Sequence, residues 1–207
     1  MLTKVGGIVN IYVNGKRIEQ VNKFRYLGAL LTEDGRCDAE IRSRIAMAKN
    51  AYNKRRELLS QRMSLETKKR IVKALVWSVA LYGAETWTLR TVDIKRIEAF
   101  EMWIWRRMEK VSWTEKKTNE EILKSVQERR CLMERVIRTK KKWIGHIVRG
   151  DGLLKEVIEG RMEGKRPRGR KRIGMLNEMK EGTYGLMKRR AEDRSLWRRW
   201  MPDWTCH

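Results

Sequence analysis

Residues 74–84, ALVWSVALYGA, form the stretch that decides the fold. They are the most apolar run of the chain, and a run of this length is too short to cross a bilayer. With the residues just before it, the run gives a helical pattern that is apolar on most sides, made of Val72, Leu75, Val76, Trp77, Val79 and Leu81. We therefore expect a deeply buried core helix that begins after Ser64, a residue type that caps helices.

Two longer helical patterns flank this core helix. The first is expected to begin with Asp38 as its cap, and its apolar stripe consists of Ile41, Ile45, Ala48, Tyr52 and Leu59. The second is expected to be capped by Thr91, and its stripe consists of Ile94, Ile97, Phe100, Ile104 and Met108. Thr118 and Glu121 form a capping-box pattern, which predicts a further short helix.

Short strands are expected before the helices. Asn14-Gly15 lies between apolar runs, and this pair is typical of a type I′ hairpin because both residues tolerate positive φ. A third strand is predicted from Phe24 to Leu31, ended by Asp34-Gly35. The predicted fold class is α+β, mostly α: short N-terminal antiparallel β-strands, then a helical bundle, then a basic helical C-terminal region.

The pattern from about Glu128 to Arg149 predicts a long helix that ends at Gly150. Its apolar face carries Leu132, Val136, Trp143, Ile144 and Ile147, and Trp143 is expected to pack beneath the helix rather than stack on a base. A narrow opposite face, here called the cation stripe, carries Arg135, Arg138, Lys142, His146 and Arg149. A merely solvated face usually interleaves Glu, and this stripe has none. Arg135, Arg138, Lys142 and Arg149 are therefore candidate phosphate-binding residues.

A second basic feature follows at residues 165–172, KRPRGRKR. Pro167 and Gly169 oppose helix formation, so an extended loop is expected over residues 164–173. The candidate nucleic-acid-binding residues of this loop are Lys165, Arg166, Arg168, Arg170, Lys171 and Arg172. A nuclear-import signal and a disordered solubilising segment remain alternatives for it.

The overall charge supports a polyanionic partner. The 207 residues include 49 Lys and Arg against 26 Asp and Glu, which gives a net charge of +23. Nucleic acid is the first expectation for the partner and an anionic membrane surface the second. Nine Trp and a large aliphatic content exclude a disordered chain. The three cysteines, Cys37, Cys131 and Cys206, are widely spaced, which favours a reducing intracellular setting and gives little support for zinc.

The sequence offers no catalytic constellation. It has no phosphate-binding glycine loop and no HExxH motif, and its only histidines are His146 and His207. No two aspartates are adjacent, whereas two-metal chemistry needs clustered carboxylates. We expect no catalytic residue, no metal site and no cofactor.

Several motifs, taken in order, resemble one family. They are Phe24–Gly28 (FRYLG) with Thr32–Gly35 (TEDG), Ala74–Leu89, Ile97–Met108, Trp143–His146 (WIGH), Glu159–Arg172 and the tail from Arg190 to Trp197. The series is similar to the carboxy-terminal part of the reverse transcriptases of non-LTR (LINE-type) retrotransposons, which are RNA-directed DNA polymerases. It covers nearly the whole chain.

The resemblance implies a function for each region. Residues 1–36 would be the end of the palm, residues 37–112 a thumb-like helical region that holds a template–primer duplex, and residues 113–207 the basic region beyond the thumb. The aspartates that bind Mg²⁺ in the complete enzyme, and its endonuclease domain, match no residue here. The expectation is a truncated, non-catalytic fragment in the nucleus that binds RNA or DNA, with a protein partner that completes the palm sheet.

Other functions stay open at this stage. The chain could act in trans with a second polymerase subunit, or serve as a helical interaction or regulatory module of the host. It could also be a decayed open reading frame without function, whose unpaired strand edge would make it prone to aggregate.

Overall fold

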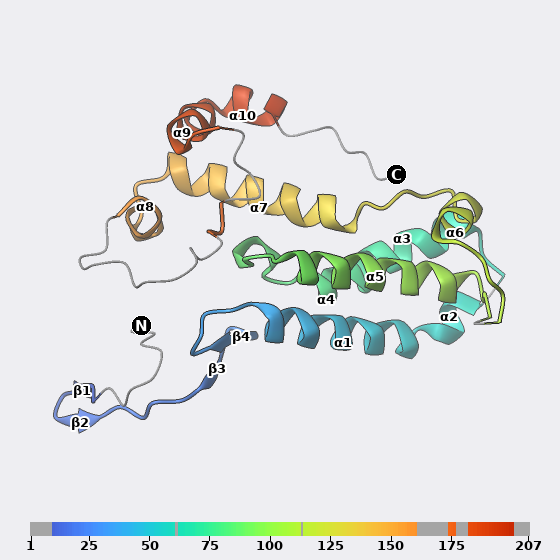
Figure 1. Ribbon diagram of the computed structural model, residues 1–207, viewed down its shortest axis with the longest axis horizontal. Helices are drawn as coiled ribbons and strands as arrows, with labels where there is room; N and C mark the ends of the chain where they lie inside the picture. The colour runs from blue at the N-terminus through green and yellow to red at the C-terminus, as the bar shows by residue number, and fades with distance from the viewer. Residues whose placement is uncertain (1–9, 61, 113, 161–173, 177–181, 201–207) are drawn as a thin grey trace.

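The protein is mostly helical, with two short antiparallel strand pairs near its N-terminus, as the sequence predicts (Figure 1). The computed structural model describes residues 10–60, 62–112, 114–160, 174–176 and 182–200. The helices are α1 (Asp38–Lys54), α2 (Arg56–Ser60), α3 (Leu65–Leu75), α4 (Trp77–Ala80), the 3₁₀ turn η1 (Ala84–Thr86), α5 (Thr91–Met108), α6 (Asn119–Ser125), α7 (Leu132–Arg149), α8 (Leu153–Glu159), α9 (Tyr184–Glu192) and α10 (Arg194–Trp200).

The hairpin predicted at Asn14-Gly15 is present but short. It joins β1 (Tyr12–Val13) to β2 (Lys16–Arg17), and Tyr12 pairs with Arg17. Asn14 and Gly15 have φ values of 50° and 74°, which are the left-handed values that a type I′ turn needs.

The single strand predicted from Phe24 to Leu31 is wrong. This stretch is itself a hairpin of β3 (Lys23–Tyr26) and β4 (Ala29–Thr32), so the expected three-stranded sheet is instead two separate pairs. Leu27 and Gly28 form the turn with φ values of 48° and 82°. Two side chains from later segments hold this turn. Leu27 O accepts from the hydroxyl of Tyr82, which lies between α4 and η1, at 2.8 Å, and Gly28 O accepts from the Arg44 guanidinium on α1.

Three long helices lie side by side in Figure 1, with α1 and α5 running in one direction and α7 in the other. Between and behind them lies the first apolar cluster, which is built from α1, α2, α3, α4, η1, α5, α6 and the first half of α7. The largest side chains at its centre are Trp77 and Trp105, which meet edge to face with their ring centroids 5.9 Å apart. This arrangement places the apolar stripe predicted for α5 inward, and that predicted for the first helix as well. The first helix is not continuous as predicted, however: it ends at Lys54, and Leu59, the last residue of its predicted stripe, is buried on α2.

The predicted core helix is buried in part but is not continuous. It breaks at Val76, where α3 ends and α4 begins, and the chain then turns at Gly83, whose φ is 71°. Val72, Val76 and Trp77 are buried, whereas Leu75 is 39% exposed. After the break, α4 packs against both α1 and α3.

The predicted helix ends are correct for some helices and shifted for others. Ser64 caps α3 by accepting from Thr67 N at 3.2 Å, and Thr118 caps α6 with Glu121 in a reciprocal box. The caps expected at Asp38 and Thr91 are displaced by one residue, because each lies inside the first turn and Cys37 and Arg90 precede them. Asp38 instead binds Arg42 one turn later, at 2.6 Å.

A second apolar cluster lies where α9 and α10 cover the far half of α7. Its buried members are Ile144, Val148, Met187, Ala191 and Trp197. Trp143 and Trp200 are partly buried and pack against it, as predicted for Trp143. The helix α7 therefore belongs to both clusters. Across the described residues, no helix is both long and apolar enough to cross a membrane.

Candidate nucleic-acid interface

The start of α7 is fixed by a buried carboxylate. Glu101, on α5, is 1% exposed and accepts from Cys131 N at 3.0 Å and Leu132 N at 3.2 Å. These amides belong to the first turn of α7, which has no helical acceptors of its own. Burial raises the pKa of the Glu101 carboxyl, and the two backbone donors partly oppose that shift.

Two lysines on the buried side of α7 also hold it in place. Lys140 is fully buried, and its ammonium donates to Trp87 O at the end of η1. The Lys141 ammonium lies 3.8 Å from the centroid of the Trp200 ring. Both lysines are therefore structural, a role that the sequence pattern did not predict.

The cation stripe lies on the exposed side of α7. Arg135, Arg138, Lys142 and His146 are all exposed, at successive turns of the helix. Within the described residues, none of the three basic side chains Arg135, Arg138 and Lys142 forms a salt bridge. The structure thus brings these three predicted residues together on a fixed surface.

Arg149 differs from the rest of the stripe. Its Nη1 donates to Ala191 O on α9 at 2.7 Å, which ties the end of α7 to the second cluster. Its side chain remains exposed, so one guanidinium serves both the fold and the surface. A substitution of Arg149 would therefore change stability as well as charge.

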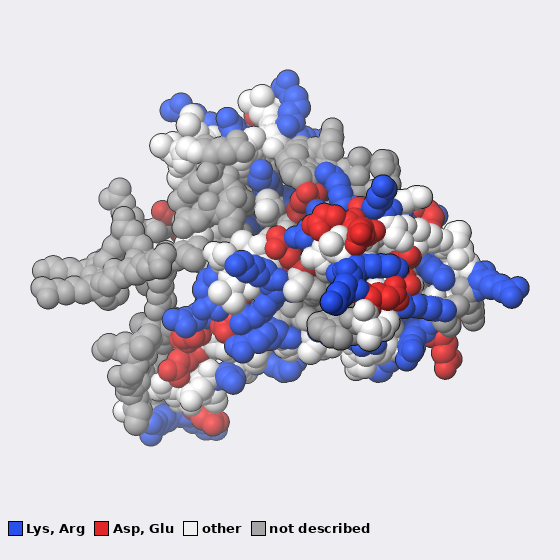
Figure 2. Space-filling view, turned by 45° about the vertical axis from the view of Figure 1, so that its right-hand side comes forward, with Lys and Arg blue, Asp and Glu red and all other residues white. Residues whose placement is uncertain are grey.

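Most acidic side chains near the core are already paired. Glu128 accepts from Lys73 at 2.6 Å and lies 3.5 Å from Lys69, and the buried Asp93 accepts from Arg90 and Arg96. Figure 2 shows a face on which Lys and Arg side chains are widely spread with a group of Asp and Glu among them. The positive charge on this face therefore does not form one uniform patch. The cation stripe on α7 differs from this face, because its Arg135, Arg138 and Lys142 form no salt bridge within the described residues.

The basic loop lies outside the described residues. This covers Lys165, Arg166, Arg168, Arg170, Lys171 and Arg172, so their role stays a prediction from the sequence.

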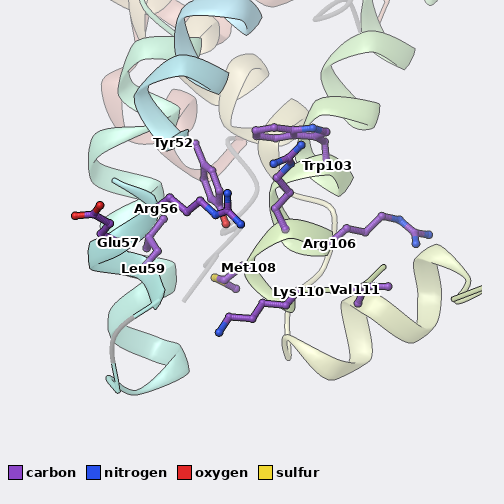
Figure 3. Close-up of a pocket in the computed structure, with 10 residues that line it drawn as sticks. Tyr52, Arg56, Glu57, Leu59, Trp103, Arg106, Met108, Lys110 and Val111 are labelled. Carbon is purple, nitrogen blue, oxygen red and sulfur yellow. The ribbon is translucent and has the colours of Figure 1, made fainter. Parts of the chain in front are cut away.

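Sequence reasoning missed a second basic site. A cavity of about 910 Å³ opens between the end of α1, α2 and the end of α5, and its lining includes Arg56, Arg107 and Lys110 beside Trp103 (Figure 3). The available signal was Trp103 followed four residues later by Arg107, which places both side chains on one helix face. This spacing indicates a site only once α2 is known to lie beside the end of α5.

The described residues contain no group of three or more His, Cys, Asp or Glu side chains that could hold a metal ion. Comparison of the chain with protein-family models, with curated proteins and with solved structures finds no match.

Proposed function

We propose that this chain binds the sugar-phosphate backbone of RNA or DNA through the α7 cation stripe. The observation that carries the proposal is the set of exposed cations Arg135, Arg138 and Lys142, which lie at successive turns and have no acidic partner in the described structure. Three unpaired like charges on one face repel one another, and phosphates relieve that repulsion. Such contacts give affinity without sequence selectivity.

The resemblance of the motifs supports a more specific form of the proposal. We infer that the chain is the carboxy-terminal part of a LINE-type reverse transcriptase and that its natural ligand is a template–primer duplex. A nuclear location would follow from that origin. Imaging the chain with a fluorescent tag tests the location, and exclusion from the nucleus would contradict it.

The decisive experiment removes the stripe's charge. The variant Arg135→Gln/Arg138→Gln/Lys142→Gln should bind a duplex more weakly, and the slope of log affinity against log salt should fall by about one unit per lost contact. The matched control is Lys16→Gln/Arg17→Gln/Lys23→Gln, which removes the same charge from the exposed hairpins. Equal losses in the two variants would mean that only net charge matters, and the proposal would fail.

We further propose that this chain alone does not catalyse DNA synthesis, because its sequence carries no clustered aspartates of the two-metal type. Primer extension with Mg²⁺ on the purified chain tests this. Extension that survives repurification would contradict it, whereas activity that appears only with a second subunit would indicate action in trans.

A second candidate function is protein binding at the hairpins. Tyr12, Phe24, Tyr26 and Leu27 are all more than half exposed on strands or turns, with Leu27 at 76%. Apolar side chains beside open strand edges are typical of surfaces that pair with another chain. Capture of one defined protein that persists after nuclease treatment and is lost in Phe24→Ser/Leu27→Ser would favour this function.

A further inference from the structure

The cavity beside Trp103 has a cationic interior. Its lining residues are contributed by α1, α2 and the end of α5 with the turn after it, and Arg107 is one of them. Figure 3 shows Arg56 directed into the space between these segments. The Arg56 and Arg107 charges both act on the Tyr52 hydroxyl, where they oppose the burial that raises the pKa of Tyr52. The cavity lining therefore includes two guanidinium groups from different helices, Arg56 on α2 and Arg107 on α5.

The acidic and the structural side chains at the rim face elsewhere. Glu57 is directed away from the cavity in Figure 3, and so is Arg106. Arg106 is used by the fold, since its Nη2 donates to Lys117 O at 2.8 Å and to Asn119 Oδ1 at 3.0 Å. The side chains left to meet a ligand are Arg56, Arg107 and Lys110, beside two aromatic rings.

The two aromatic rings of the cavity, those of Trp103 and Tyr52, form an apolar wall. Trp103 lies nearly parallel to Phe100, at 17° and 6.2 Å between centroids, and meets the edge of Tyr52 at 5.4 Å. The Arg107 guanidinium lies 4.8 Å from the centroid of Trp103. A guanidinium held on an indole offers its other planar face to a stacking partner.

We propose that this cavity binds one nucleotide of a single strand, with the base stacked on the Arg107–Trp103 layer and the phosphate held by Arg56 and Lys110. The volume of about 910 Å³ lies within the range of small-ligand pockets and accepts a nucleotide. Stacking on a planar cation serves any base, so little sequence preference is expected. The inference rests on the proposed nucleic-acid binding but uses residues that the α7 stripe does not.

The experiment compares single-stranded and duplex probes on the full chain. In Arg56→Gln/Arg107→Gln/Lys110→Gln, affinity for a short oligothymidylate should fall about tenfold or more, while duplex affinity changes less than about twofold. The control is again Lys16→Gln/Arg17→Gln/Lys23→Gln. A urea titration of each variant checks that the fold is retained. Trp103→Leu should reproduce the single-strand loss without any change of charge.

Further probes separate this inference from the proposed function. Thymidine monophosphate should bind the unaltered chain and the stripe variant alike, and should not bind the cavity variant. That result would support the cavity even if duplex binding proved absent. If the monophosphate does not bind, or if the cavity and control variants lose single-strand affinity equally, the inference is overturned. Displacement by a polyglutamate peptide without any binding of the monophosphate would assign the cavity to acidic proteins and also overturn it.

Discussion

The indole of Trp197 lies directly on Gly145. Trp197 Nε1 donates to Lys141 O at 3.1 Å, across the one position of α7 that has no side chain in the way. A Cβ atom at residue 145 would come within 2.2 Å of that nitrogen. The close approach of α10 to α7 therefore depends on a glycine in the middle of a helix, where alanine would otherwise be preferred.

Gly145→Ala should consequently destabilise the protein. Overpacking and loss of the indole hydrogen bond outweigh the gain in helix propensity, and the expected net loss is about 1–3 kcal/mol in the free energy of unfolding. Gly185→Ala is the matched control, because a Cβ in α9 meets nothing closer than 4.0 Å. Urea denaturation should rank the control at or above the unaltered chain, and a Gly145→Ala variant that gained stability would refute the packing argument.

Glu101 should make stability depend on pH. Burial raises its pKa in the folded state above the ordinary 4.5, so the folded protein binds the proton more tightly than the unfolded chain. The stabilisation of the folded state that follows from this raised pKa is fully present below about pH 4.5. It is lost as the pH rises through the raised pKa of Glu101. The unfolding free energy of the unaltered chain minus that of Glu101→Gln should therefore decrease as the pH rises over this window. A difference that stays constant, or increases, would exclude the shift.

Arg149 and Arg138 should separate stability from surface charge. Arg149→Gln removes the bond to Ala191 O and should cost about 1 kcal/mol of stability. Arg138→Gln removes the same charge from an exposed side chain and should change stability by less than about 0.5 kcal/mol. Thermal unfolding of the two variants measures this, and equal shifts in Tm would show that the Arg149 contact contributes nothing.

The β3–β4 turn should loosen when Tyr82 loses its hydroxyl. Tyr82→Phe removes the hydrogen bond to Leu27 O. The free energy needed to open the hairpin locally should therefore fall by about 0.5–1 kcal/mol. Amide exchange at Leu30, whose N–H donates to Glu40 Oε2 at 2.8 Å, should quicken while that of Ile104 in α5 is unchanged. Tyr26→Phe is the control, and the same increase there would remove the turn contact as the cause.

The sequence predicted the fold class and the existence of most helices because their apolar stripes are periodic. It could not predict that residues 24–31 turn back at Leu27, since leucine rarely adopts positive φ and the turn is held by Tyr82 and Arg44, which lie later in the chain. The break at Val76 was missed for a related reason. A run that is apolar on most sides has no face that marks where the helix must bend.

The sequence predicted the part of the candidate site that lies on a single helix, α7, but not its contacts with other segments. Helical spacing places Arg135, Arg138 and Lys142 on one exposed face, and the structure agrees. The same spacing cannot tell that Lys140 reaches Trp87 O or that Arg149 reaches Ala191 O, because both acceptors come from other segments. The cavity beside Trp103 needs three segments at once, and the Trp103–Arg107 spacing indicates only the part that α5 contributes.

The helix α7 also holds its cations at fixed distances from one another. It runs unbroken from Leu132 to Arg149 and is clamped by a different apolar cluster at each end, so its surface cannot flex without bending a rod about 27 Å long. Arg135 and Lys142 are then kept about 10 Å apart along the axis, because seven residues of unbroken helix separate them. Any strand that lies along α7 meets charges at a preset interval, and a ligand with a different charge spacing would fit them less well.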